Sequence, residues 1–228
     1  DVDISSTITI SYSNIEDGQD SIVTNDNGTV TWGAGNIDAD PVFVDTANGN
    51  YHLLASSQCI NGGDPTTFDS DGSRADIGAY PYLNSYSGPT WYVETEGNDT
   101  TGTGATDNPF RSIQAGINFS SAADSVTVAA GTYVENINFR GRNIQVVGVN
   151  RETTIIDGDS SGVVVTFENS EDSTAVLSGF TIQNGYAVDG GGIICKTSSP
   201  TLMNVTITGN SASVQGGGIH SINSSPSL

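Results

Sequence analysis

Basic residues are scarce in this sequence, which contains 6 Lys and Arg residues against 26 Asp and Glu residues and has a formal net charge of -20. Proteins that bind nucleic acids or anionic membranes do so with clusters of Lys and Arg. We therefore expect neither partner, and acidic polysaccharides would need a cation to bridge them. The acidic residues are spread along the whole chain. This spread favours a solvated acidic surface suited to salty water, with calcium-binding turns as the alternative.

Long apolar runs are also missing, and cysteine is rare. No run approaches the length of a membrane-spanning helix, so the sequence predicts no membrane span. Cys59 and Cys195 each lie in an apolar stretch, which favours two buried thiols over a disulfide between them. The sequence begins without Met and shows no signal peptide, so we expect an internal segment of a longer polypeptide.

What the sequence does contain is short β-branched runs separated by Gly, Asn and Ser. The runs at 7–10, 126–128, 144–147 and 206–207 are examples, and the chain has 28 Gly residues. Runs of this kind are absent from disordered chains, so they predict folded structure. Many short strands joined by such turns predict an all-β protein.

Internal repetition is the strongest signal. The segment DGGGI at 189–193 recurs as QGGGI at 215–219, and SSP at 198–200 recurs at 224–226, each at an offset of 26 residues. A period of this length suits one coil of a parallel β-solenoid, with short strands on three walls. Stacked coils bury like residues in ladders and stack Asn residues at turns. The predicted pairs are Ile193 over Ile219, Leu202 over Leu228, Ile182 near Ile207, and Asn184 with Asn210.

A short amphipathic helix is predicted at 109–120. Phe110, Ile113 and Ile117 follow helical spacing, Asn108 is the expected N-cap, and Pro109 suits the first helical position. Solenoid ends expose unpaired strand edges and need a cover. We therefore expect this helix to cap the first coil.

Several segments of the chain resemble bacterial extracellular right-handed parallel β-helix proteins of the pectate-lyase-like superfamily, which include relatives of the chlamydial polymorphic outer-membrane proteins. The resemblance implies a right-handed parallel β-helix and an extracellular or cell-surface location. Residues 37–80 are similar to the C-terminal end of such proteins, and the later segments are similar to their N-terminal start and coils. The segments that carry the resemblance to the start are WYV at 91–93, GND at 97–99, NPF at 108–110, SIQ at 112–114, GTY at 131–133, ENI at 135–137 and IIDG at 155–158.

The order of these parts suggests how the units are arranged. Residues 1–83 read as the last coils and closing segment of one β-helix unit, 84–90 as a linker, and 91–228 as the cap and first coils of the next unit. An ending therefore precedes a beginning, as in a segment cut from a tandem array. We expect such units to join head to tail into a fibre, either within one polypeptide or between copies of the chain.

An enzyme is the least favoured reading, although the superfamily contains polysaccharide lyases and hydrolases. A lyase needs a base, usually Arg or Lys, beside an acid neutralised by calcium. We expect Arg140 and Arg142 to bind backbone carbonyls or carboxylates, and Arg74 to pair with Asp71 or Asp76. The sequence therefore predicts no catalytic residue and no organic cofactor.

Calcium is the one cofactor that the sequence suggests. Asp69, Asp71 and Asp76 alternate around a Gly turn, in the pattern of oxygen ligands that hard cations favour. The alternative is that each Asp forms an Asx-turn without metal.

Two non-enzymatic functions follow from the fold. A structural unit that binds itself is favoured, and a surface adhesin that binds glycans along one wall is the alternative. The adhesin requires Tyr86, Trp91, Tyr92 and Tyr186 to line one groove.

Overall fold

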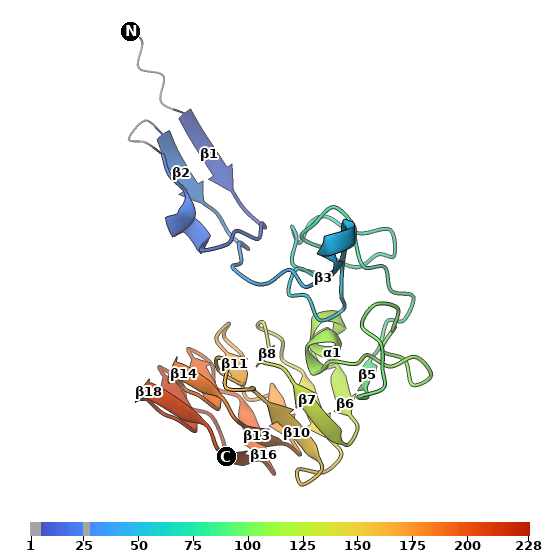
Figure 1. Ribbon diagram of the computed structural model, residues 1–228, viewed down its shortest axis with the longest axis vertical. Coiled ribbons are helices and arrows are strands. Elements are labelled where there is room, and N and C mark those ends of the chain that lie inside the picture. The colour runs from blue at the N-terminus through green and yellow to red at the C-terminus, as the bar shows by residue number, and fades with distance from the viewer. Residues whose placement is uncertain (1–5, 25–27) are drawn as a thin grey trace. The chain divides into compact units, whose positions relative to one another are not determined.

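The computed structural model describes residues 6–24 and 28–228, and it divides the chain into two compact units, Asp1–Ser85 and Tyr86–Leu228. Figure 1 shows the chain coloured from its N-terminus to its C-terminus. Within the described residues, no helix has the length and apolar character needed to cross a bilayer. We call the two parts unit 1 and unit 2 and describe each by itself.

Unit 2 is a parallel β-solenoid, as predicted. Its chain winds repeatedly through three walls, so each wall is a parallel sheet whose neighbouring strands come from successive coils. The first wall contains β5 (Thr90–Val93), β6 (Ser125–Val128), β9 (Gln145–Gly148), β12 (Val176–Ser178) and β16 (Thr201–Met203). The second contains β7 (Gly131–Val134), β10 (Thr154–Asp157), β13 (Thr181–Gln183) and β17 (Thr206–Thr208). The third contains β8 (Ile137–Asn138), β11 (Val165–Phe167), β15 (Ile193–Lys196) and β19 (Ile219–Ile222), and β14 (Tyr186–Asp189) pairs with β18 (Ser211–Gln215) beside them.

The core of unit 2 consists of ladders of inward-facing apolar residues. Strand side chains alternate between two faces, and stacking coils in register therefore places one apolar residue directly over the next. The predicted pairs Ile193 over Ile219 and Ile182 over Ile207 are confirmed by the strand register. The third predicted pair is Leu202 over Leu228. Ser227 pairs with Thr201, which agrees with the predicted offset, but Leu228 itself is 83% exposed.

The predicted uniform offset of 26 residues is wrong for part of the last coil. The offset is 25 between β13 and β17 and becomes 26 between β15 and β19. The extra residue is absorbed where the register of β14 and β18 shifts. For this reason Asn184 does not stack on Asn210; instead the Asn210 side chain accepts from the Gly185 N–H and donates to the Ile182 carbonyl, at 2.8 and 2.9 Å.

The capping helix exists, but the predicted start and N-cap are wrong. Helix α1 spans Ile113–Phe119, with Ser112 as its N-cap. The segment 108–110 lies outside the helix. The Phe110 N–H donates to the Tyr92 carbonyl, and the Phe110 carbonyl accepts from the Glu94 N–H. Phe110 thereby extends the first wall instead of beginning a helix. Figure 1 shows α1 at the end of the solenoid beside β5 and β6, away from β18.

Unit 1 contains a smaller pair of parallel strands followed by an irregular segment. Strands β1 (Ser6–Ile10) and β2 (Gly28–Trp32) pair in parallel, and β3 (Phe43–Asp45) and β4 (Asn50–Leu53) pair antiparallel. The short 3₁₀ turns are η1 (Gly18–Ser21) and η2 (Thr46–Asn48). The coil predicted from residue 1 begins outside the described residues. The Asn14 side chain exchanges two hydrogen bonds with the Ala39 backbone, which fixes the end of the coil to the segment that follows β2.

Both cysteines are buried thiols, as predicted, and in the described part of the chain no disulfide joins them. The Cys59 sulfur accepts a 3.5 Å contact from the Asn14 side chain. Burial raises the pKa of the Cys195 thiol to about 11.

Candidate functional site

The most elaborate polar cluster in unit 2 lies at the start of helix α1. The first N–H groups of a helix have no partner within the helix and must find one elsewhere. Here Asp99 accepts from the Arg111 and Ser112 N–H groups at 2.8 and 3.2 Å. Glu135 accepts from the Ile113 and Gln114 N–H groups at 2.8 and 3.0 Å. Two carboxylates thus hold four consecutive backbone donors, and we call Asp99 and Glu135 the carboxylate clamp.

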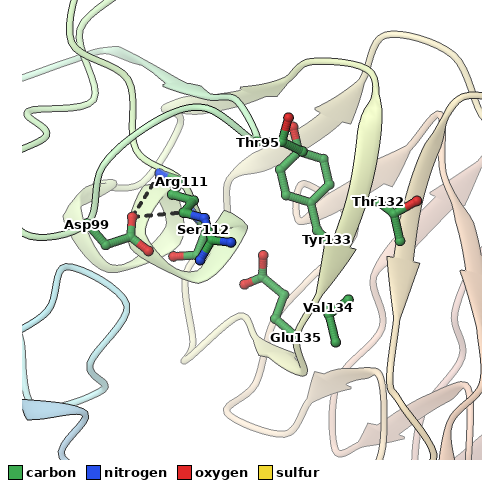
Figure 2. A pocket seen from close by; sticks show the side chains of 8 residues that line it. All are labelled: Thr95, Asp99, Arg111, Ser112, Thr132, Tyr133, Val134 and Glu135. Carbon is green, nitrogen blue, oxygen red and sulfur yellow. Dashed lines mark hydrogen bonds between the residues drawn. The ribbon is translucent and has the colours of Figure 1, made fainter.

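The clamp borders a small pocket of about 150 Å³. Figure 2 shows the Glu135 carboxylate pointing toward the backbone at Ser112, and dashed lines join Asp99 to Arg111 and Ser112. The hydroxyl of Tyr133 donates to the Ala129 carbonyl at 2.9 Å. The lining residues are Thr95, Asp99, Arg111, Ser112, Thr132, Tyr133, Val134 and Glu135.

The electrostatics of the clamp centre on Glu135. Burial raises the pKa of this carboxyl to about 7, and the neighbouring charge of Asp99 adds to the rise. The two backbone N–H donors and Arg111 act in the opposite direction. Desolvation penalises the charged form more strongly than these partners favour it. Burial, helped by the charges of Glu135 and Glu94, also raises the pKa of Tyr133 to about 12.

The other end of α1 is held by Arg140 and Arg142, and the predicted binding to backbone carbonyls is confirmed for Arg142. Arg142 donates to the carbonyls of Ser120 and Asn118 at 3.0 Å each. Arg140 donates to the Asn118 side chain at 2.7 Å. Cations favour the carbonyl end of a helix because its dipole is negative there. Acidic groups at the start and arginines at the end therefore fix α1 over the first coils.

The three aspartates predicted to bind calcium lie in one loop of unit 1. One Asp71 oxygen accepts from the Ser73 N–H and hydroxyl at 2.9 and 2.6 Å, which is an Asx-turn. Asp76 accepts from the Asn61 and Tyr82 N–H groups, and Asp69 accepts from the Asp76 N–H. Over residues 6–24 and 28–228, no group of three or more His, Cys, Asp or Glu side chains is arranged to hold a metal ion. Calcium at this loop stays a prediction.

Burial raises the pKa of Asp76 to about 6, and the charges of Asp69 and Asp71 contribute to the rise. The predicted pairing of Arg74 with Asp71 or Asp76 is wrong. The Arg74 guanidinium donates to the carbonyls of Gly63 and Gly62, at 2.7 and 3.4 Å, and lies 5.9 Å from the Tyr12 ring centre. The aspartates are instead satisfied by backbone N–H groups, which sequence spacing alone did not reveal.

The four aromatic residues predicted to line a glycan groove do not lie together on one exposed surface. Trp91 is 3% exposed and packs with Phe110 and Phe119 beneath the cap. Tyr86 contacts Trp91 edge-on, whereas Tyr186 is 54% exposed on β14. Trp91 therefore belongs to the core, and these side chains do not form the predicted aromatic groove.

The clamp offers proton chemistry in principle, because an acid with a pKa near 7 is suited to proton transfer at neutral pH. Both Glu135 oxygens, however, already accept helix N–H groups. Sequence analysis did not single out Asp99 or Glu135 as site residues. The signal lay in the motifs GND at 97–99 and ENI at 135–137, which carried the resemblance without showing what they contact.

The capped stack of coils defines the chain as a parallel β-solenoid. Residues 95–140 match the family model described as "Protein of unknown function (DUF1565)". All eight residues that line the pocket at the clamp fall within this match. Searches of curated proteins and of solved structures each returned no match.

Proposed function

We propose that this chain is a structural unit of an extracellular β-helix that assembles end to end into a fibre or surface stalk. The observation that supports this proposal is the open edge of unit 2. In the part of the chain that the structure describes, β17, β18 and β19 are each the outermost strand of their sheet, and β16 is followed by the single bridge between Thr201 and Ser227. Such edges are templates for further strand pairing.

The ladders end at the same edge. Ile182 and Ile193 are fully buried, whereas Ile207 and Ile219, one coil further along, are only partly buried. A further coil placed on β17 and β19 would cover both residues, because each coil of a solenoid buries the face of its neighbour. The next coil can come from the same polypeptide or from a second copy.

Helix α1 gives the assembly a direction. It covers the first coils of unit 2, where it packs on β5, β6 and β8, and this supports extension from the β16–β19 edge. In unit 1, β1 pairs with β2 on one side, and Ile8 is 53% exposed. We propose that the β16–β19 edge in unit 2 of one repeat of this chain pairs with β1 in unit 1 of the next repeat. This arrangement is a head-to-tail joint.

The extracellular location rests on the resemblance to secreted members of the pectate-lyase-like superfamily, and the net charge of -20 agrees with a well-solvated surface. Both Glu135 oxygens already accept hydrogen bonds from helix N–H groups, and this favours a scaffold over an enzyme. Calcium at Asp69, Asp71 and Asp76 is proposed as a stabiliser of the unit 1 loop.

Electron microscopy of the purified chain, with and without a calcium chelator, tests the proposal. We expect filaments for the natural sequence and shorter assemblies for Ile219→Asp, which places a charge at the open edge. The matched control is Val134→Asp, because Val134 is 65% exposed on β7, away from that edge. Discrete short rods from the natural sequence under every condition would contradict the end-to-end joint.

A second experiment adds the calcium chelator to the natural protein and to Asp71→Asn. This variant keeps an oxygen for the Asx-turn while removing the charge. If calcium binds the loop, chelation should lower the unfolding temperature of the natural protein and leave that of the variant unchanged. Equal behaviour of both proteins would remove calcium from the proposal without affecting the fibre.

A further inference from the structure

Unit 1 contains a mostly apolar cavity that neither the fold nor the proposed fibre explains. Its volume is about 320 Å³, which lies within the range of pockets that bind small molecules. Apolar and aromatic side chains supply most of its wall. The lining residues are Asn14, Pro41, Phe43, Tyr51, Cys59, Ile77, Gly78 and Ala79.

Two aromatic rings meet at the wall of this cavity. Phe43 on β3 and Tyr51 on β4 have ring centres 5.5 Å apart, and their planes are at 90°. Tyr51 is 51% exposed, so its ring is accessible to a ligand. Aromatic faces carry a negative electrostatic potential and attract cations, most strongly those whose charge is spread over apolar groups.

A second cavity of about 610 Å³ adjoins the first and shares Asn14 and Pro41 with it. Its remaining wall includes Glu16, Asp38 and Asp40. One Asp40 oxygen accepts from the Val42 N–H at 2.9 Å, which orients this carboxylate within the wall. The aromatic cavity therefore opens beside three negative charges, and among the described residues neither wall includes Lys or Arg.

We propose that these adjoining cavities bind a small organic cation with an alkylated ammonium group, whose apolar methyl groups contact Phe43 and Tyr51 and whose charge faces Glu16, Asp38 and Asp40. Charge complementarity excludes an anionic occupant. The aromatic wall favours a methylated nitrogen over a bare metal ion, because ring faces attract a cation whose charge is spread over methyl groups and have no use for a compact hydrated ion. We call Phe43, Tyr51, Asp38 and Asp40 the cation pocket.

A ligand titration of the full chain followed by NMR tests this proposal. Choline is the probe, and 3,3-dimethylbutan-1-ol is its control, because the two have the same shape and differ in charge. Choline should bind at least about tenfold more tightly than the neutral alcohol, since the cation–aromatic and carboxylate attractions act on the charge. Added salt should weaken choline binding, because Glu16, Asp38 and Asp40 are exposed and dissolved ions screen their attraction for the cation.

Three variants separate the two walls of the pocket from the rest of the protein. Tyr51→Leu keeps an apolar side chain but removes the ring, and Asp40→Asn keeps the oxygen that accepts from Val42 while removing the charge. Each should weaken choline binding by several-fold and leave the circular dichroism spectrum unchanged. Tyr186→Leu is the matched control, because Tyr186 is 54% exposed, close to the 51% of Tyr51, but lies in unit 2.

Several outcomes would overturn the proposal. One is the absence of saturable choline binding at millimolar concentrations, and another is equal binding of the neutral alcohol. Retention of binding in both Tyr51→Leu and Asp40→Asn would show that choline binds elsewhere. None of these results depends on filament formation, so the fibre and the cation pocket are tested separately.

Discussion

Glu135 should make the stability of unit 2 depend on pH in a direction opposite to that of most carboxylates. Its folded-state pKa is about 7, raised from an ordinary value of 4.5. A raised pKa means that the folded protein binds the proton more tightly than the unfolded chain does. The contribution of Glu135 is therefore fully present below pH 4.5 and is lost as the pH rises through 7.

The size of this effect follows from the shift. Each pKa unit corresponds to about 1.4 kcal/mol, so a shift of this size is linked to a free energy of unfolding that falls by roughly 3 kcal/mol between acid and alkaline pH. For a domain of this size, 3 kcal/mol corresponds to an unfolding temperature lower by on the order of 10 °C. Asp76 in unit 1 has a folded pKa of about 6 and acts in the same direction.

Thermal unfolding of the natural protein and of Glu135→Gln, measured between pH 5 and pH 8.5, checks the reasoning. Gln cannot titrate, so the difference between the two proteins isolates Glu135 from Asp76. Gln also supplies one acceptor oxygen instead of two, and loss of one hydrogen bond to a helix N–H should cost about 1–3 kcal/mol at every pH. The absolute stability of the variant is therefore lower, but its pH dependence should be flatter.

The decisive quantity is the slope of the unfolding temperature against pH. If Glu135→Gln loses stability with rising pH as steeply as the natural protein does, then Glu135 does not titrate near neutrality and the desolvation argument fails.

Three further predictions concern packing and reactivity. Gly185→Ala should prevent the last coils from stacking, because an added Cβ would lie 1.8 Å from the Gly191 carbonyl oxygen; limited proteolysis should then cut near β14. Ile182→Ala should lower the free energy of unfolding by about 2–5 kcal/mol, measured by urea denaturation, because Ile182 is fully buried within its ladder. Cys195, whose pKa is raised to about 11, should resist alkylation at pH 8 until the protein is denatured, as mass spectrometry would show; rapid labelling of the native protein would contradict its burial.

The sequence predicted the solenoid well because the core repeats. Each coil places β-branched residues on the same inward positions, so one alignment at a fixed offset revealed both the walls and the pair Ile193–Ile219. It did not predict that the offset changes from 25 to 26 within one coil. That change depends on where a turn accommodates an extra residue, and the Gly-rich segments on both sides obscure it.

The polar cluster was harder to predict than the core. Asp99 and Glu135 lie 36 positions apart and meet only because the coil brings the end of β7 beneath the start of α1. The aspartates at 69, 71 and 76 looked like a cation site because they lie around a Gly turn, but sequence does not reveal which oxygens already accept from backbone N–H groups. The helix start was misplaced for a similar reason, since Pro109 suits both a first helical turn and an extended strand.

The register shift between β14 and β18 shows where this architecture accepts variation. The three walls keep their ladders on both sides of the shift, so a change in coil length is confined to one corner. Insertions of several residues at that corner would project outward as loops and leave the stacked core intact. The corner is therefore the natural place at which related sequences would differ in length, and at which a recognition peptide could be grafted without rebuilding the rod.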